Sequence, residues 1–240
     1  MNDGGEDRSV SEVTIAPLAA AAHELKSPLA LVRQLALQLE QSDLSDGQRS
    51  MLHRITLTSE RALRLTTDLT KASRLEDALF SLEPINPEQI CRAIVHELHP
   101  LFEAHDRTLS FSQRKHPLLL VANRDLLRRI LTNFSDNALF YTEPGTAVHL
   151  QIKALKKTGA IRIGVRDYGP ALSTDMWKSL QKKLSKAPQS VHARPQSSGL
   201  GLFLASQFAE AMDGRIGMVR HRDGATFYVE LQASRQLSLL

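Results

Sequence analysis

Two stretches of the sequence repeat their apolar residues in alternating steps of four and three, and this period constrains the fold more than any other feature. Steps of this size place side chains on one helical face and form a packing seam between helices. The stretches span about residues 13–40 and 48–75, on either side of the turn-forming segment SDLSDGQ at 42–48. The apolar positions are Leu18, Ala22, Leu25, Leu29, Val32, Ala36 and Leu39 in the first stretch and Leu52, Ile55, Ala62, Leu65 and Leu69 in the second.

Two long helices joined by a short turn predict an antiparallel helical hairpin over residues 13–77. A lone hairpin leaves its apolar seam exposed, so we expect two copies to pair into a dimeric four-helix bundle. The alternative is a monomeric hairpin packed on its own C-terminal domain. The polar residues 1–12 are interpreted as a flexible lead-in.

The remainder of the chain predicts a different architecture, an α/β sandwich over residues 78–233 with a short tail at 234–240. Helical and strand patterns interleave without regular βαβ alternation, which favours a mixed sheet with helices on one face. The fold class is therefore α+β. Strands are predicted near 80–86, 107–113, 117–123, 146–154, 160–167, 215–222 and 226–233, and helices near 87–105, 124–140 and 199–212.

Residues 168–198 show no clear period and carry several cations among Ser, Pro and Gln. A segment of this length inside a domain is either functional or disordered, and we interpret it as a lid over a binding site. Its basic residues are Lys178, Lys182, Lys183, Lys186 and Arg194.

Composition excludes several classes. The formal charge of +4 suits an anionic ligand such as a nucleotide but is too small and dispersed to indicate nucleic acid. No apolar run approaches the ~20 residues that cross a bilayer, and the polar N-terminus does not resemble a signal peptide. Cys91, the one cysteine, is expected to be a buried thiol in a reducing cytoplasm. The chain is thus expected to be cytoplasmic, either by itself or as the soluble part of a membrane-associated sensor.

The segment HELKSPL, residues 23–29, places a reactive group on the first helix. His23 and Ser27 lie one turn apart on an exposed face beside the apolar seam. Glu24 can accept a hydrogen bond from one imidazole nitrogen and leave the other free to attack an electrophile. Pro28 removes the hydrogen bond to the carbonyl of Glu24, which predicts a kink beside the pair.

Two further motifs lie in the C-terminal region. Asn133 and Asn137 are four residues apart on a predicted helix, and an amide oxygen there is a hard ligand suited to Mg²⁺ that also contacts nucleotide phosphates. Asp167 ends a predicted strand and Gly169 follows it, where glycine allows close approach of a ligand to the backbone. Taken alone, this D-x-G is equally typical of a turn that ends a strand.

The segment GLGL at 199–202 begins a predicted helix. Backbone amides and the positive end of the dipole at a helix N-terminus bind phosphates. Taken alone, this tetrapeptide also fits a flexible helix start.

In this order the motifs resemble those of the sensor histidine kinases. HELKSPL resembles the phosphoacceptor box, LLRRILTNFSDNALFYTEPG the asparagine box, VRDYGPALS and SSGLGLFLASQFAEAMDG the two glycine boxes, and DGATFYVEL the closing hairpin. The resemblance covers about residues 13–232. It implies a dimerisation and histidine-phosphotransfer hairpin followed by a Bergerat-type ATPase domain.

The resemblance implies a role for each matching residue. His23 would be phosphorylated from MgATP, Glu24 would accept its proton, and Ser27 would serve a phosphatase activity. The phosphoryl group would pass to the receiver domain of a response regulator, and the kinase would act as a homodimer. Asn137 would bind the metal, and the nucleotide would be held by Asn133, Asn137, Tyr141, Asp167, Gly169, Gly199, Leu200, Gly201 and Leu202.

Three departures from the family pattern leave alternatives open. Phe140 stands where a cation often contacts phosphate, and Ala171 replaces the second glycine of D-x-G-x-G. The phenylalanine segment between the glycine boxes has only Trp177, Leu180 and Leu184 as candidates. The basic lid is expected to compensate for Phe140. The alternatives are a degenerate kinase that acts as a phosphotransfer or dimer scaffold, and a Bergerat-type ATPase outside signalling.

Overall fold

The structure is a computed structural model that describes residues 9–73, 81–112, 118–169, 177–178 and 200–234. Contacts between residues divide the chain into two compact units, Met1–Ala78 and Leu79–Leu240. Among the described residues, no helix is both long and apolar enough to span a bilayer.

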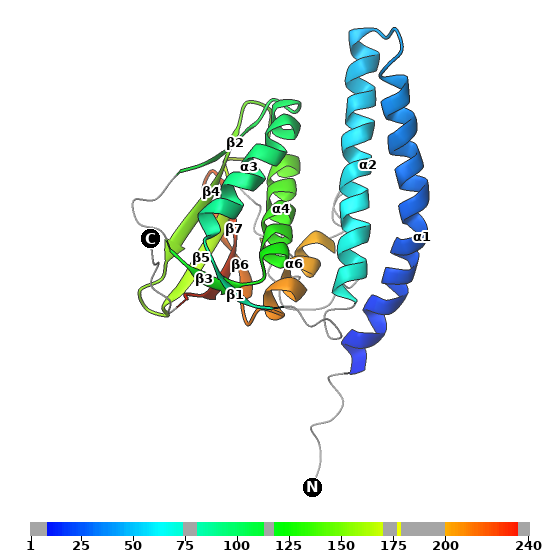
Figure 1. Ribbon diagram of the computed structural model, residues 1–240. Coiled ribbons are helices and arrows are strands. Elements are labelled where there is room, and N and C mark those ends of the chain that lie inside the picture. Colours follow the sequence, from blue (N-terminus) through cyan, green and yellow to red (C-terminus); the bar gives the residue numbers. More distant parts are fainter. Residues whose placement is uncertain (1–8, 74–80, 113–117, 170–176, 179–199, 235–240) are drawn as a thin grey trace. The chain divides into compact units, whose positions relative to one another are not determined.

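The first unit is a hairpin of α1 (Ser9–Leu39) and α2 (Asp46–Ala72) (Figure 1). α2 begins two residues before its predicted start because Ser45 caps it. The Ser45 hydroxyl accepts a hydrogen bond from the backbone N–H of Gln48, and the Gln48 side chain accepts one from the backbone of Ser45. This reciprocal pair satisfies two amides that the first turn of a helix otherwise leaves without partners.

The apolar seam predicted on α1 consists of two rows of residues that differ in exposure. Ala22 and Ala36 are buried against α2 and Leu29 is half-buried, whereas the second row is 44–54% exposed. The exposed row consists of Leu25, Val32 and Leu39. Within each row the spacing is seven residues, and the rows lie side by side because three residues fall short of one helical turn. α2 therefore covers the row that contains Ala22 and Ala36, and it leaves the other row exposed.

The N-terminal boundary of the hairpin also differs from the prediction. α1 begins at Ser9, so the lead-in assigned to residues 1–12 is wrong for residues 9–12. None of these four residues breaks a helix, and Pro17, the first proline, lies further along the chain. Residues 1–8 lie outside the described part.

The second unit contains a two-stranded sheet and a five-stranded sheet. β1 pairs antiparallel with β3, and the larger sheet has the strand order β2-β4-β5-β7-β6. β2 and β4 are parallel, and the other pairs in the larger sheet are antiparallel. The strands are β1 (Glu83–Ile85), β2 (Thr108–Phe111), β3 (Leu120–Ala122), β4 (Ala147–Ala154), β5 (Ala160–Asp167), β6 (Arg215–His221) and β7 (Gly224–Gln232).

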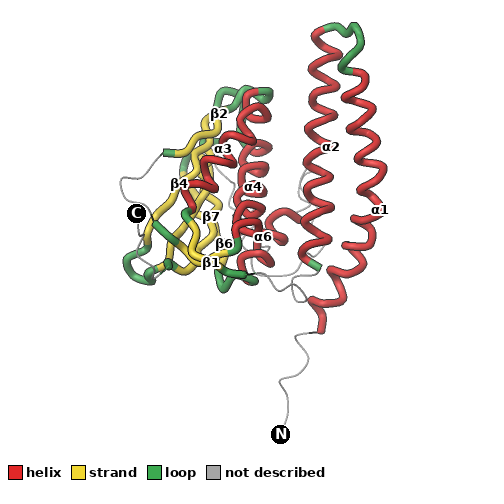
Figure 2. The backbone as a smooth tube through the Cα atoms, viewed as in Figure 1, coloured by secondary structure: helices red, strands yellow, loops and turns green. Residues whose placement is uncertain are grey.

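Three described helices, α3 (Pro87–Glu103), α4 (Arg124–Tyr141) and α6 (Leu200–Glu210), lie on one face of the five-stranded sheet (Figures 1 and 2). Strand residues alternate between this buried face and a more polar one. Phe134 of α4, Phe208 of α6 and Val229 of β7 are among the fully buried core residues. Cys91 of α3 is also buried and free, as expected, and burial raises the pKa of its thiol to about 12 with a smaller contribution from Glu88. The predicted α+β class, with a helical hairpin followed by a mixed sheet covered by helices on one face, is confirmed.

Candidate functional site

His23, Glu24 and Ser27 are all exposed on α1. His23 and Ser27 lie on the opposite flank of the helix from the exposed row of Leu25, Val32 and Leu39, because successive residues turn by about 100°. α1 continues as a helix through Pro28, and the expected kink stays a prediction. The histidine is therefore accessible to a reactant within this unit.

The asparagine pair lies on α4, which Asn123 caps by accepting hydrogen bonds from the backbone N–H groups of Asp125 and Leu126. Asn133 is only 6% exposed, and its buried Nδ2 atom has no hydrogen-bond partner among the described residues. Asn137, one turn later, is half-buried. A buried amide without a partner is costly, so this donor is suited to an anionic ligand such as a phosphate oxygen.

The N-terminus of α6 packs against this amide. A Cβ atom placed on Gly201 would lie 3.7 Å from Oδ1 of Asn133, so the glycine backbone and the asparagine side chain are neighbours. Leu202 is buried and Leu200 half-buried, while Gly199 lies outside the described residues. The first amides of a helix have no partners within it and can donate to an anion. The structure thus brings the asparagine motif and the second glycine motif together.

Asp167 ends β5 and is buried to 6% exposure. Its Oδ1 atom accepts hydrogen bonds from the backbone N–H of Ala225 at 3.0 Å and of Gly169 at 3.4 Å. Burial raises the pKa of the carboxyl group, and these two hydrogen bonds and the charge of Arg166 act against that rise. Both of the hydrogen bonds from Ala225 and Gly169 reach Oδ1, so this oxygen faces the start of β7 and the segment after β5.

Gly169 links this carboxylate to the end of α4. A Cβ atom on Gly169 would lie 3.1 Å from the carbonyl oxygen of Tyr141 and 3.4 Å from the Cα atom of Thr142. The first of these contacts is tighter than an ordinary van der Waals separation, so a side chain would require the carbonyl of Tyr141 to shift by a few tenths of an ångström. Asp167 and Gly169 therefore lie beside the C-terminal end of the helix that carries Asn133 and Asn137.

Sequence reasoning missed Arg107, which holds the end of α4 in place. Its guanidinium donates to the Thr142 hydroxyl at 2.9 Å, to the Thr142 carbonyl and to the carbonyl of His105 at 2.7 Å. Burial lowers the pKa of Arg107, and Asp106 acts in the opposite direction. No sequence motif reports such a contact, because Thr142 lies 35 residues away.

Several predicted features fall outside the described residues. They are Ala171 and the candidate phenylalanine-segment residues Leu180 and Leu184, together with the lid cations Lys182, Lys183, Lys186 and Arg194. Of the lid, only residues 168–169 and the pair Trp177 and Lys178 are described, with Trp177 half-buried and Lys178 exposed.

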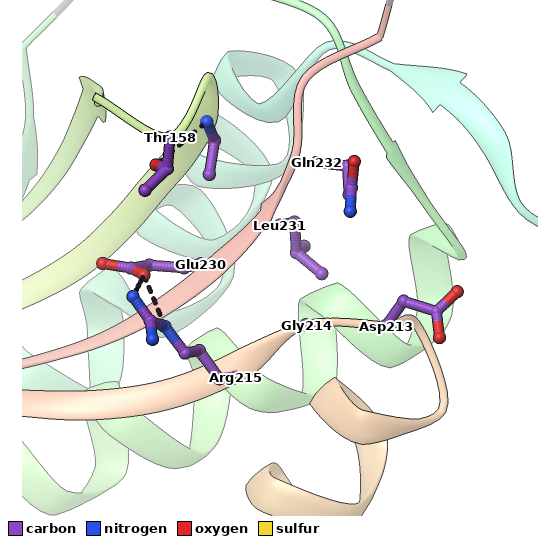
Figure 3. Close-up of a pocket in the computed structure, with 8 residues that line it drawn as sticks. Thr158, Asp213, Gly214, Arg215, Glu230, Leu231 and Gln232 are labelled. Carbon is purple, nitrogen blue, oxygen red and sulfur yellow. Dashed lines mark hydrogen bonds and ion pairs between the residues drawn. The ribbon is translucent and has the colours of Figure 1, made fainter. Parts of the chain in front are cut away.

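A separate cavity of about 310 Å³ lies where β5 begins and β7 ends. Figure 3 shows Arg215 turned toward Glu230, which is buried and pairs with both Arg215 and Arg162. Asp167 is at the other end of β5, about 20 Å away at the usual rise per strand residue. This cavity is therefore distinct from the asparagine and glycine motifs.

The described residues contain no group of three or more His, Cys, Asp or Glu side chains able to hold a metal ion. A cation at the site would therefore need ligands from a bound nucleotide besides a protein amide. An asparagine oxygen and phosphate oxygens are suitable for Mg²⁺, which usually keeps several waters and few protein ligands.

Comparison with known proteins supports the resemblance of this chain to the sensor histidine kinases. Residues 122–235 match the family "Histidine kinase-, DNA gyrase B-, and HSP90-like ATPase". The chain is 28% identical over 221 residues to the sensor protein GacS of Pseudomonas syringae, covering 90% of this chain and 24% of GacS. It is 26% identical to the histidine protein kinase SaeS of Staphylococcus epidermidis, covering 88% of this chain and 61% of SaeS.

A solved structure of a similar protein supports the same resemblance. The crystal structure of full-length ShkA in complex with AMPPNP aligns with a TM-score of 0.65 and 27% identity, covering 95% of this chain and 48% of ShkA. The chain thus spans between a quarter and about three fifths of the length of these three proteins. The part of the chain that the family model matches, residues 122–235, carries the asparagine and glycine motifs. The resemblance of the whole chain to the catalytic core of a sensor histidine kinase is confirmed.

Proposed function

We propose that this chain is the kinase core of a two-component sensor, which binds MgATP in its second unit and phosphorylates His23. The observation that carries the proposal is the unpartnered, buried Asn133 amide beside the N-terminus of α6, in a chain that also exposes a phosphoacceptor motif. The ATPase family match and the AMPPNP complex of ShkA support ATP as the ligand.

In this proposal each motif contacts one part of the nucleotide. Oδ2 of Asp167 accepts a hydrogen bond from the adenine amino group, and Gly169 and Tyr141 line the same part of the site. Asn133, Leu200 and Leu202 support the nucleotide at the other end, where the amides at residues 199–201 donate to phosphates. Mg²⁺ would neutralise phosphate charge when bound, and Asn137 would offer its amide oxygen as the protein ligand.

Phosphoryl transfer then requires a nucleophile and a proton acceptor. A neutral imidazole nitrogen of His23 attacks the γ-phosphorus, a nitrogen–phosphorus bond forms, the bond to the β-phosphate oxygen breaks, and ADP leaves. Glu24 takes the proton from the other imidazole nitrogen and keeps the ring oriented during attack.

The proposal extends to partners. The exposed row of Leu25, Val32 and Leu39 is suited to a second copy of the hairpin, which would complete a four-helix bundle and leave His23 accessible on the opposite flank. The phosphoryl group would pass from His23 to an aspartate of a response-regulator receiver domain. Ser27, exposed one turn from His23, would orient water in dephosphorylating that regulator. A cytoplasmic location for these steps is part of the same proposal.

One experiment separates this function from its alternatives. The protein is incubated with γ-labelled ATP and Mg²⁺, and wild type is compared with His23→Ala and Asn137→Ala. The proposal predicts acid-labile label on wild type that both variants lose. Glu24→Gln serves as a further variant and should slow labelling without weakening nucleotide binding.

The other outcomes identify the alternatives. ATP turnover that survives His23→Ala without labelled protein would indicate a Bergerat-type ATPase outside signalling. The absence of both labelled protein and ATP turnover would indicate the degenerate scaffold. The departures at Phe140 and Ala171 are the basis for that alternative.

A further inference from the structure

The guanidinium of Arg166 is buried beside Asp167 and bonds to both sides of a β-turn. The residue is only 6% exposed, and its ion pair is with the carboxylate of Asp223. It also donates to the carbonyl oxygens of Asp167, Asp223 and Ala225, the latter two at 3.3 and 3.5 Å. The guanidinium therefore ties the β6–β7 turn at residues 222–223 and the start of β7 to the end of β5.

The guanidinium of Arg166 also contacts an aromatic ring. Arg166 stacks on Tyr168, with its Cζ atom 4.2 Å from the ring centroid. A planar, delocalised cation forms both the stack and the fork of hydrogen bonds, which an ammonium group cannot do together. The position of the turn thus depends on an arginine at this site.

The β6–β7 turn also orients the carboxylate of Asp167. Oδ1 accepts from the backbone N–H of Ala225, a residue at the start of β7, and so faces β7. In the proposed nucleotide complex the other oxygen, Oδ2, accepts a hydrogen bond from the ligand, and a small rotation of the carboxylate would move it. The direction in which Oδ2 presents its lone pairs is consequently set by the turn.

Gly224 allows this close approach. Its φ of +126° is unfavourable for other residues, and a Cβ atom there would lie 2.3 Å from the carbonyl oxygen and 2.6 Å from Oδ1 of Asp167. A side chain would therefore displace either the turn or the carboxylate. Two independent features, a buried cation and a glycine, converge on the position of one carboxylate.

We propose that Arg166 and residues 223–225 are positioning residues that set the base specificity of the nucleotide site. This inference rests on the proposed function. A fixed carboxylate oxygen accepts from the amino group at C6 of adenine, whereas the C6 carbonyl of guanine would face it with a second acceptor. A carboxylate free to rotate would lose this discrimination while still contacting either base.

The test compares the affinities of the full chain for ATP, GTP and N6,N6-dimethyl-ATP, which lacks the amino hydrogens. Wild type should prefer ATP over the other two by about a hundredfold or more, as sites built around a hydrogen bond do. In Arg166→Gln the preference should fall by about tenfold, the scale of one hydrogen bond to a charged group. The fall should come from weaker ATP binding, with affinity for the dimethyl analogue unchanged.

Arg162→Gln is the matched control. Arg162 lies on the same strand, stacks on Tyr228 at 3.8 Å and pairs with Glu230, but at the far end from Asp167. Its replacement should leave the preference for ATP unchanged. Because Arg166→Gln removes a buried group and can unfold the domain, Asp223→Asn is included. The Asp223 carboxylate is 64% exposed, and the variant should lower the preference in the same direction by a smaller factor.

Equal loss of affinity for all three nucleotides in Arg166→Gln and Asp223→Asn would overturn the inference, because that result marks a purely structural role. An unchanged preference in both variants would overturn it as well. If wild type itself binds ATP no better than the dimethyl analogue, the proposed contact of Asp167 with adenine fails, and the proposed function fails if no nucleotide binds.

Discussion

At the scale of the residue, the Asp167 carboxyl group combines opposing influences. Burial raises its pKa, while hydrogen bonds from Ala225 and Gly169 and the charge of Arg166 favour the ionised form. Only the ionised carboxylate is a strong acceptor for an amino group, since the protonated form can instead donate. The protonation state of this one group should therefore control nucleotide affinity.

The first prediction is a pH dependence of ATP affinity. Affinity should be constant above the pKa of Asp167 and fall as the pH drops through it. Because that pKa is raised, the fall should begin at a higher pH than for an ordinary aspartate. Titration calorimetry at a series of pH values checks this, with Asp167→Asn as the control for protonation of the nucleotide itself. An identical pH profile in wild type and Asp167→Asn would contradict the assignment.

The motif residues at this scale could be named from the sequence, because the spacing of Asn133 and Asn137 and the GLGL string are local patterns. Arg107 and Arg166 could not be identified from the sequence. Their partners Thr142 and Asp223 lie 35 and 57 residues away, and only the fold brings them into contact. The roles of the motif residues themselves stay predictions that the proposed experiments test.

At the scale of the element, α4 is fixed at both ends. Asn123 caps its first turn, and Arg107 bonds to the hydroxyl and carbonyl groups of Thr142 after its last. The carbonyl of Tyr141 then packs on Gly169. These contacts of Arg107 with Thr142, which we call the clamp, connect the start of β2 with the helix that carries both asparagines.

The second prediction concerns this clamp. Arg107→Lys should lower the free energy of unfolding by about 1–2 kcal/mol, because a lysine ammonium cannot reach the acceptors that the guanidinium fork reaches together. Chemical denaturation of the full chain, followed by circular dichroism, measures the change. Arg92→Lys is the control, since Arg92 is exposed, pairs with Glu88 at 3.8 Å and lies 6.0 Å from the centroid of the Phe111 ring, without a fork of short hydrogen bonds to any described residue. That change should be within about 0.5 kcal/mol. Similar losses in both variants would contradict the clamp.

Element types could be predicted from sequence because periodicity and capping are local. The helix at Pro87–Glu103, for example, follows its cap Asn86 and begins with proline, both readable signals. The packing of α1 could not be predicted, because a seven-residue repeat does not show which of two adjacent rows meets the partner helix. Ala22 and Ala36 face α2 since small side chains allow close approach of the two helices.

At the scale of the whole molecule, the exposed row on α1 is the main evidence for assembly. Leu25, Val32 and Leu39 are 54%, 44% and 52% exposed, and Leu31, Leu35 and Met51 of the same hairpin are exposed as well. Soluble monomers rarely leave apolar side chains grouped in this way. The heptad spacing of the row is typical of helices that pair along their length.

The third prediction is that this row holds a dimer together. The double variant Leu25→Gln, Val32→Gln should shift the chain from dimer to monomer, because each copy would bring polar groups into the seam without partners. Sedimentation equilibrium measures the mass. Leu82→Gln, at another exposed leucine in the second unit, should leave the mass unchanged. A wild-type chain that sediments as a monomer at every concentration would contradict the prediction.

Phosphoryl transfer from ATP to His23 is the step on which the proposed function depends. The most direct measurement is mass spectrometry of peptides from the protein incubated with MgATP and kept at neutral or alkaline pH, where phosphohistidine survives. We expect one phosphoryl group on His23, absent from Asn137→Ala and from samples without Mg²⁺. A phosphoryl group on another residue, or an unmodified His23 in a protein that binds ATP, would contradict it.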